Sequence, residues 1–192
     1  MLDSKARNFY DKWITAPLLS KTGLRSVAPG WITLFGCVMG VSVFFLLWLG
    51  FPKSAVTTLM LSGVLDTLDG AAARHQGKVS DRGAILDIIS DRLVEFGVIL
   101  GLFATRPLER GWLCMLMLGS VLLCITSFLV VGIFSQNTSA KSFHYSPGLM
   151  ERTEAFGFFA AMILFPSAFS VLSILFSALV LWTASTRIMQ SR

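Results

Sequence analysis

The sequence predicts an all-α integral membrane protein whose six transmembrane helices form one bundle. Three observations lead to this fold class. The 192 residues are 54% hydrophobic and 14% charged, whereas soluble domains are about 25% charged. Six apolar stretches approach the length that crosses roughly 30 Å of hydrocarbon, and Lys and Arg are unevenly distributed between the segments that join them. We therefore expect a single membrane domain over residues 1–192.

The first expected element precedes the spans. Residues 4–20 mix side chains such as Phe9, Tyr10 and Trp13 with basic residues, which is typical of an amphipathic helix lying at the lipid headgroups. A solvated leader is the alternative. Charged residues precede the first apolar run and no small-residue cleavage site follows one, so no secretory signal peptide is expected. The segment 3–25 is thus predicted to lie on the membrane surface.

The six spans are expected, in order, at 31–50, 54–75, 81–103, 111–134, 152–166 and 168–188. A short polar loop around Gln76, Gly77 and Lys78 separates the second span from the third, so these two helices should be antiparallel neighbours. Pro166 interrupts the last apolar run and divides it into the fifth and sixth helices. The fifth span is consequently short.

The basic residues predict the orientation of the bundle. With the N-terminus inside, the outer loops hold Lys53, Arg106 and Arg110, and Arg92 lies within a span. The other twelve of the 16 Lys and Arg residues fall in inner segments: Lys5, Arg7, Lys12, Lys21, Arg25, Arg74, Lys78, Arg82, Lys141, Arg152, Arg187 and Arg192. This bias satisfies the positive-inside rule and places both termini in the cytoplasm.

The net charge of +5 is explained by this topology and by anionic lipid. The basic residues are dispersed and accompany no groove-reading or stacking motif, so nucleic-acid binding is not expected. Cys37, Cys114 and Cys124 lie within apolar runs without CxxC spacing or histidine neighbours. Packing is therefore their expected role, and neither a disulfide nor a zinc site is predicted.

Four carboxylates lie at or within the second and third predicted helices. Asp66 and Asp69 are three residues apart and Asp87 and Asp91 are four apart, so each pair projects from one helical face. Facing carboxylates repel in a low-dielectric setting, and a cation is expected between them. Oxygen ligands without Cys or His favour Mg²⁺, Mn²⁺ or Ca²⁺ over zinc. Four acids suit two ions, an arrangement characteristic of phosphoryl transfer.

The residues around the acids suit a phosphate ligand. Gly70 directly follows Asp69, and Gly83 lies one turn before Asp87. Neither glycine presents a side chain, so a bulky group could approach the backbone. Arg74, one turn after Gly70, carries a planar fork that matches phosphate oxygens.

Other interpretations remain open for these residues. Gly70 and the alanines after it could be close-packing positions, and Arg92 with Glu95 could be a structural ion pair outside the chemistry. A cation-coupled transporter would also place acids inside a bundle, although it would not need the glycines and Arg74 at this spacing. A purely structural membrane subunit gives no reason for four intramembrane acids, which are costly and mark functional sites.

The acids and their neighbours fit the pattern D-x2-D-G-x2-A-R-x8-G-x3-D-x3-D, the signature of the CDP-alcohol phosphatidyltransferase family. The eight fixed positions are filled by Asp66, Asp69, Gly70, Ala73, Arg74, Gly83, Asp87 and Asp91. The chain also resembles this family in the six-helix layout, the interfacial N-terminal helix and the cytoplasmic site.

The resemblance implies transfer of a phosphatidyl-type group from a CDP-linked lipid to a small alcohol, with release of CMP. It also implies that the four aspartates hold two divalent cations, Mg²⁺ or Mn²⁺, that Asp91 is in addition the catalytic base, and that the enzyme is a homodimer. The CDP-linked lipid would contact Asp66, Asp69, Gly70, Ala73, Arg74 and Gly83. Its tails would enter from the inner leaflet, and the sequence leaves ester and ether linkages open.

One family element departs from its usual form. The Pro-Asn-x-x-Thr element that often precedes the first span reads Pro29-Gly30-Trp31-Ile32-Thr33 here. Asn is thus replaced by Gly30, while Thr33 could still reach the donor.

Three cations mark an expected acceptor site: Lys141, Arg152 and Arg187, at the cytoplasmic ends of the later helices. Such cations suit a phosphorylated acceptor, although the positive-inside rule alone also explains them. Residues 146–154 resemble the Gly-x-x-Glu-Arg-x-Glu segment of inositol-phosphate-using members, with a shorter intervening loop. Inositol phosphate is therefore the first acceptor considered, glycerol 3-phosphate the second and serine the third.

Overall fold

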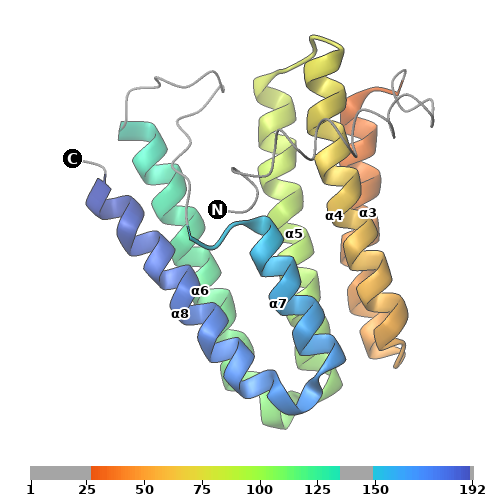
Figure 1. Ribbon diagram of the computed structural model, residues 1–192, viewed down its shortest axis with the longest axis vertical. Coiled ribbons are helices and arrows are strands. Elements are labelled where there is room, and N and C mark those ends of the chain that lie inside the picture. The colour runs from red at the N-terminus through yellow and green to blue at the C-terminus, as the bar shows by residue number, and fades with distance from the viewer. Residues whose placement is uncertain (1–26, 135–148, 191–192) are drawn as a thin grey trace.

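The computed structural model describes residues 27–134 and 149–190, and within these ranges all regular structure is helical (Figure 1). The elements are α3 (Pro29–Trp48), α4 (Pro52–His75), α5 (Asp81–Thr105), α6 (Pro107–Phe134), α7 (Arg152–Leu164), the 3₁₀ turn η3 (Pro166–Ala168) and α8 (Phe169–Gln190). These α-helices lie, in order, at the six predicted positions, with ends shifted by a few residues. The N-terminal interfacial helix expected within 3–25 lies outside the described residues.

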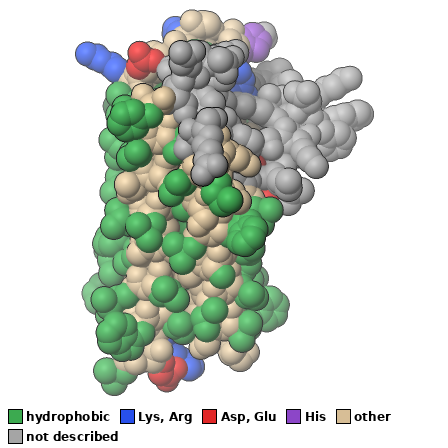
Figure 2. Space-filling model, turned by 90° about the vertical axis from the view of Figure 1, so that its left-hand side faces the viewer, with side chains coloured by type: hydrophobic (Ala, Val, Ile, Leu, Met, Phe, Trp, Pro, Cys, Tyr) green, Lys and Arg blue, Asp and Glu red, His purple; other side chains and the backbone are tan. Residues whose placement is uncertain are grey.

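Three helical stretches of the described chain are long and apolar enough to cross a bilayer, namely Pro29–Trp48, Pro107–Phe134 and Pro166–Gln190. α4 and α5 carry the acids, which lower their hydropathy, and α7 has only 13 residues, fewer than the roughly 20 needed for a full span. Crossing of the bilayer by α4, α5 and α7 thus remains a prediction. Figure 2 shows apolar side chains over the length of the visible face, between charged ends, as a membrane protein requires.

Local signals explain where the helices begin and turn. Proline occupies the first position of α3, α4 and α6, where its missing N–H costs nothing. The Ser80 side chain caps α5 by accepting a hydrogen bond from the Gly83 N–H at 3.2 Å. Between α4 and α5, Gly77 adopts a φ of +63°, which glycine tolerates without strain. Gln76 ties this turn to the start of α3 by donating from Nε2 to the Val27 carbonyl at 2.9 Å.

Helix α3 packs closely against α4 and α5 through small residues. A Cβ atom on Gly40 would lie 2.4 Å from Val94 Cγ2 of α5 and 2.8 Å from the Ser62 hydroxyl of α4. That hydroxyl donates to the Gly36 carbonyl at 2.7 Å. Gly36 and Gly40 therefore form a small-xxx-small seam, which lets helix backbones approach in a membrane.

The opposing surface of α5 carries a second seam of the same spacing. A Cβ on Gly97 would lie 3.4 Å from Val41 Cα, and one on Gly101 would lie 3.1 Å from Phe44 Cα. Helices α4 and α5 run antiparallel, as expected, but in the described structure each packs mainly against α3 and scarcely against the other. The acid-bearing faces of the two helices are thereby held opposite each other by a third helix.

The other half of the bundle is built from α6 and α8, which lie side by side, with α7 packed against α4 and α8 (Figure 1). α6 also contacts α5, so the core lies between the two halves. Its largest fully buried side chains include Phe159, Phe176, Leu59, Leu102 and Met117.

Arg110 was assigned to an outer loop, but the structure places it in the first turn of α6, where it is 5% exposed. Its Nη1 donates to the Leu102 carbonyl at 3.2 Å and to Thr105 Oγ1 at 2.7 Å. The guanidinium also lies 4.3 Å from the centroid of the Phe169 ring. Arg110 therefore joins the end of α5 to the starts of α6 and α8 at the end of the bundle distant from the acids.

Candidate active site

Carboxylates from α4 and α5 meet between the two helices. Asp66, Asp69 and Asp87 each offer an oxygen, and these oxygens lie within 4.8 Å of one another. Asp69 is 6% exposed, and no hydrogen-bond donor in the described part of the chain reaches its Oδ2. Convergent carboxylates with such an unsatisfied buried oxygen fit a hard divalent cation.

The fourth predicted ligand, Asp91, lies one turn beyond Asp87 on α5 and outside this three-carboxylate cluster. Its carboxylate forms an ion pair with Arg152 of α7, and the same guanidinium pairs with Asp66 of α4. Arg152 therefore bridges the two acid-bearing helices. The four aspartates come together as predicted, but they divide into a cluster of three and a separate arginine-linked acid.

The start of α7 positions Arg152. The Met150 N–H donates to Thr183 Oγ1 of α8 at 3.0 Å, which anchors the chain just before the helix begins. The Arg152 guanidinium also lies 5.1 Å from the centroid of the Phe156 ring, one turn along. Packing of α7 against α4 then directs Arg152 toward the acids.

The other predicted acceptor residues are placed differently. Arg187 of α8 is 9% exposed, with Nη1 3.4 Å from Cys124 Sγ of α6 and its guanidinium 5.2 Å from the centroid of the Phe128 ring. Lys141 lies outside the described residues. Convergence of these two cations with Arg152 in one pocket therefore remains a prediction.

Few groups of the described residues lie near the glycines of the predicted donor site. A Cβ on Gly70 would meet Arg74 Nη1 at 3.4 Å, and one on Gly83 would meet the Ser80 hydroxyl at 3.4 Å. Among the described residues no other group outside the local helix backbone comes within 4 Å of either position. These glycines thus do not serve close packing of helices within the described structure, and Arg74 lies directly over Gly70.

The remaining predicted donor residues lie at the edges of the cluster. The Thr33 hydroxyl of α3 lies beside the Asp69 carboxylate and donates to the Pro29 carbonyl at 3.2 Å. Ala73 is partly buried on α4, next to Arg74. The structure thus brings α3, α4 and α5 together around one acidic centre.

Sequence reasoning left Arg92 and Glu95 out of the chemistry, yet the structure places them beside Asp91. Arg92 Nη1 lies 2.7 Å from Glu95 Oε2, and Arg92 Nη2 lies 4.0 Å from Asp91 Oδ2. The available signal was a pair of opposite charges, three residues apart, inside a predicted span and next to a functional acid.

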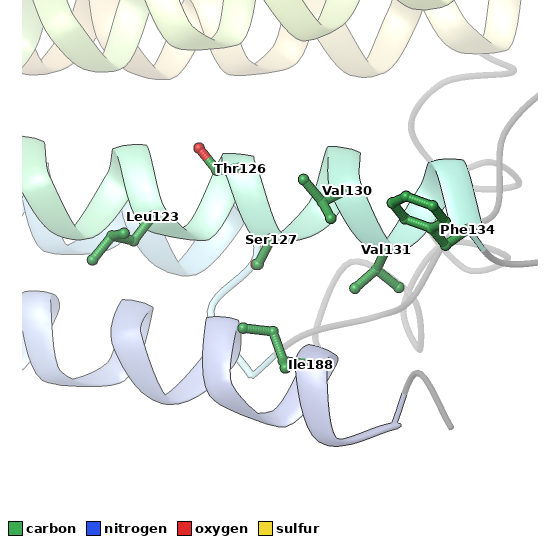
Figure 3. Close-up of a pocket in the computed structure, with 7 residues that line it drawn as sticks. All are labelled: Leu123, Thr126, Ser127, Val130, Val131, Phe134 and Ile188. Carbon is green, nitrogen blue, oxygen red and sulfur yellow. The ribbon is translucent and has the colours of Figure 1, made fainter.

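An apolar groove of about 390 Å³ lies between α6 and α8 (Figure 3). It is lined by Leu123, Thr126, Ser127, Val130, Val131, Phe134 and Ile188. Its lining includes none of the acids, so it is separate from the acidic centre.

The fold and the acidic centre together define a helical membrane protein with three convergent carboxylates whose oxygens suit a divalent cation. The model of the family described as CDP-alcohol phosphatidyltransferase matches residues 26–188, and the chain belongs to this family. It is accordingly an enzyme, a transferase of phospholipid biosynthesis. This membership favours the transferase over the transporter considered from the sequence.

Individual relatives and a solved structure are similar to the chain over most of its length. The chain is 35% identical over 182 residues to the inner membrane protein YnjF of Escherichia coli, covering 89% of this chain and 84% of the relative. It is 29% identical to the phosphatidylinositol phosphate synthase of Mycobacteroides abscessus, covering 82% and 71%. The Mycobacterium tuberculosis phosphatidylinositol phosphate synthase, crystallised with CDP-DAG bound, shares the fold with a TM-score of 0.67, 23% identity and 93% coverage of each chain.

Proposed function

We propose that this enzyme transfers a phosphatidyl-type group from a CDP-linked lipid such as CDP-diacylglycerol to a hydroxyl of inositol phosphate, releasing CMP. The observation that carries the proposal is the meeting of Asp66, Asp69 and Asp87, with oxygens within 4.8 Å of one another, at the fixed positions of the family signature. Asp91 lies beside them and pairs with Arg152.

The proposed metal ligands are Asp66, Asp69, Asp87 and Asp91, which would hold two divalent cations, Mg²⁺ or Mn²⁺. Bound ions of this kind neutralise a diphosphate and stabilise the charge that develops on its leaving oxygen. The unsatisfied buried oxygen of Asp69 and the absence of sulfur or imidazole from the donor set support this choice.

The donor would be bound by residues that leave space or offer phosphate contacts. Gly70 and Gly83 present an open backbone surface, and Arg74 Nη1 lies over Gly70, where its planar fork can contact phosphate oxygens. Thr33, next to Asp69, and Ala73 border the same surface. Holding the donor in one orientation supplies much of the rate enhancement.

Asp91 is the proposed base. It takes the proton of the acceptor hydroxyl while the acceptor oxygen bonds to the lipid-side phosphorus of the donor. The bond from this phosphorus to the bridging oxygen of the diphosphate breaks, and CMP leaves with the electron pair. The position of Asp91, outside the cluster of three and adjacent to Arg152, supports giving it a role distinct from that of the other acids.

The acceptor phosphate is assigned to Arg152, together with Arg187 and Lys141. Arg152 lies at the acids, so a phosphate bound there would bring the acceptor hydroxyl near Asp91. The 29% identical relative from Mycobacteroides abscessus is a phosphatidylinositol phosphate synthase, which supports inositol phosphate over glycerol 3-phosphate and serine. The active site is proposed to face the cytoplasm in a multi-pass, homodimeric protein.

The test is an acceptor screen with the purified protein, CDP-diacylglycerol and Mg²⁺ or Mn²⁺. Inositol phosphate, free inositol, glycerol 3-phosphate and serine are compared, with CMP release and product mass as readouts. Free inositol is the matched control because it lacks only the phosphate. We expect CMP and phosphatidylinositol phosphate with inositol phosphate alone. Equal turnover of free inositol would contradict the proposed phosphate-binding role of Arg152. Product formed from another acceptor would identify that compound as the substrate in place of inositol phosphate.

A further inference from the structure

Arg92 and Glu95 form a charged pair on α5 that the proposed reaction does not use. Glu95 is 7% exposed, and its Oε2 lies 2.7 Å from Arg92 Nη1. Burying charge in a membrane helix is costly, and such residues are usually retained for function. Arg92 directly follows Asp91, and Glu95 lies one turn beyond it, so a role linked to Asp91 is considered.

Cationic groups lie near both oxygens of Asp91. Its Oδ1 pairs with Arg152 of α7, and its Oδ2 lies 4.0 Å from Arg92 Nη2. An aspartate side chain rotates about two bonds, and a cation near each oxygen favours one orientation. The printed contact of Arg152 is to Oδ1, and Arg92 is the cation near Oδ2.

Glu95 in turn restrains Arg92. The Arg92 side chain is 34% exposed, and a long arginine with an exposed head can swing toward water or lipid phosphate. The contact between Arg92 Nη1 and Glu95 Oε2 occupies one nitrogen and leaves Nη2 directed at Asp91. The three residues thus form a chain of contacts from Glu95 through Arg92 to Asp91.

We propose that Arg92 and Glu95 are positioning residues for the transfer reaction: Glu95 holds Arg92, and Arg92 keeps the Asp91 carboxylate oriented toward the acceptor hydroxyl. The inference rests on the proposed function, in which Asp91 is the base. Arg152 is there assigned to the acceptor phosphate, so it must share its guanidinium during turnover. Arg92 is the partner that stays with Asp91 throughout.

The chain contains a matched control for this pair. Arg106 and Glu109 have the same order and spacing, with Nη1 and Oε2 3.1 Å apart, but they lie where α5 meets α6, at the end of the bundle away from Asp91. Their side chains are 57% and 67% exposed. Changes to this pair report how much an arginine–glutamate contact matters when no acid of the site is nearby.

The experiment measures kcat, KM for both substrates and thermal unfolding for Glu95→Gln and for Glu109→Gln, using CMP release by the folded fraction. Misplacing a reacting group costs roughly ten- to a hundredfold in rate, so Glu95→Gln should lower kcat by at least tenfold. Both KM values should stay within about twofold, because Glu95 is assigned to neither the donor site nor the acceptor site. Glu109→Gln should leave kcat unchanged. Normal kcat for Glu95→Gln would overturn the inference.

Two further variants keep the test decisive if Glu95→Gln does not fold. Arg92→Lys retains the charge but cannot span Glu95 and Asp91 with two separate nitrogens, so its kcat should also fall. The exchange variant Arg92→Glu with Glu95→Arg restores an ion pair, yet places a carboxylate beside Asp91. If the pair had only a structural role, the exchange would recover both stability and kcat, and recovery of kcat would contradict the positioning role. We expect the exchange to recover stability alone.

Failure of the inference and failure of the proposed function give different results. If the unaltered chain releases no CMP from CDP-diacylglycerol with any acceptor, the proposed function is wrong and the inference falls with it. If the unaltered chain is active while Glu95→Gln and Arg92→Lys match its kcat, only the positioning role is overturned.

Discussion

Asp69 and Asp91 belong to one sequence motif, yet their surroundings differ. Asp69 is buried and carries an oxygen that no donor in the described chain reaches, which suits a cation ligand. Asp91 pairs with Arg152, and Arg92 lies near its second oxygen. At the scale of single residues, the structure therefore supports unequal roles for acids that the motif presents as equivalent.

Gly70 provides a prediction that separates binding from packing. A Cβ at this position would meet Arg74 Nη1 at 3.4 Å, the end of a flexible side chain, and no other group among the described residues. Gly70→Ala should therefore fold normally and raise the thermal unfolding temperature slightly, because alanine favours the helix by up to about 1 kcal/mol. The affinity for CDP-linked lipid should nevertheless fall. Unchanged affinity, measured by CDP-lipid titration, would remove Gly70 from the donor site.

Arg152 provides a second residue-scale prediction. Arg152 pairs with Asp66 and Asp91 through Nη1. Arg152→Lys keeps the positive charge but loses the planar guanidinium that matches phosphate oxygens. We expect a higher KM for inositol phosphate and a lower kcat, with donor affinity retained, and a larger effect for Arg152→Ala. Arg106→Ala, on an exposed arginine at the far end, is the control. An acceptor KM that does not change in Arg152→Ala would refute the phosphate-binding assignment.

At the scale of the elements, the glycine seams of α3 and α5 determine how the acids face each other. Gly40→Ala would place a Cβ 2.4 Å from Val94 Cγ2, a buried β-branched side chain that has little room to move. Overpacking of this kind costs about 1–3 kcal/mol, so the thermal unfolding temperature in detergent should fall. Gly119→Ala is the matched control, because nothing described lies within 4 Å of its Cβ. Equal unfolding temperatures for the two variants would show that Gly40 is not needed for close packing of α3 against α4 and α5.

The helices themselves could be predicted from the sequence because hydropathy and proline are local signals. Pro52, Pro107 and Pro166 stand where α4, α6 and η3 begin, and the six predicted ranges correspond to α3–α8. The packing of α3 against both α4 and α5 was missed, although the spacing of Gly36 and Gly40 is a recognised packing signal. Spacing alone does not say which helix the seam faces.

In the candidate site, too, local features could be predicted from the sequence, whereas contacts between distant segments could not. The four aspartates and the glycines were found from one short stretch of sequence, since the motif spans only residues 66–91. The bridge from Arg152 to Asp66 and Asp91 joins residues far apart in the chain, and it depends on how α7 packs against α4. Arg92 directly follows Asp91 and Glu95 lies one turn beyond it, so their nearness to Asp91 was visible in the sequence. The direction of the Arg92 guanidinium, toward both carboxylates, is known only from the structure.

In the whole molecule, the α4–α5 turn and the α5–α6 turn lie at opposite ends of the bundle (Figure 1). The acids lie in the halves of α4 and α5 next to the first turn, and Arg106, Glu109 and Arg110 lie at the second. The positive-inside rule predicts that the end with the acids faces the cytoplasm. Arg110 does not change this predicted orientation, because its charge is buried against Leu102, Thr105 and Phe169.

The orientation can be measured by labelling with a membrane-impermeant maleimide. Lys78, in the α4–α5 turn, and Glu109, near the start of α6, are both exposed and lie at opposite ends. Glu109→Cys should react in intact cells, whereas Lys78→Cys should react only after permeabilisation. The native Cys37 and Cys114 are buried and should give little background. Labelling of Lys78→Cys in intact cells would show that the end with the acids faces outward, opposite to the predicted orientation.

The acids of α4 and α5 are proposed to form a site for phosphatidyl transfer in which Asp91 is the base. The most direct measurement is CMP release from CDP-diacylglycerol, with inositol phosphate and Mg²⁺ or Mn²⁺, by the unaltered enzyme and by Asp91→Asn, alongside CDP-lipid affinity. We expect turnover by the unaltered enzyme, none by Asp91→Asn and similar donor affinity for both. Near-normal turnover by Asp91→Asn would contradict the account.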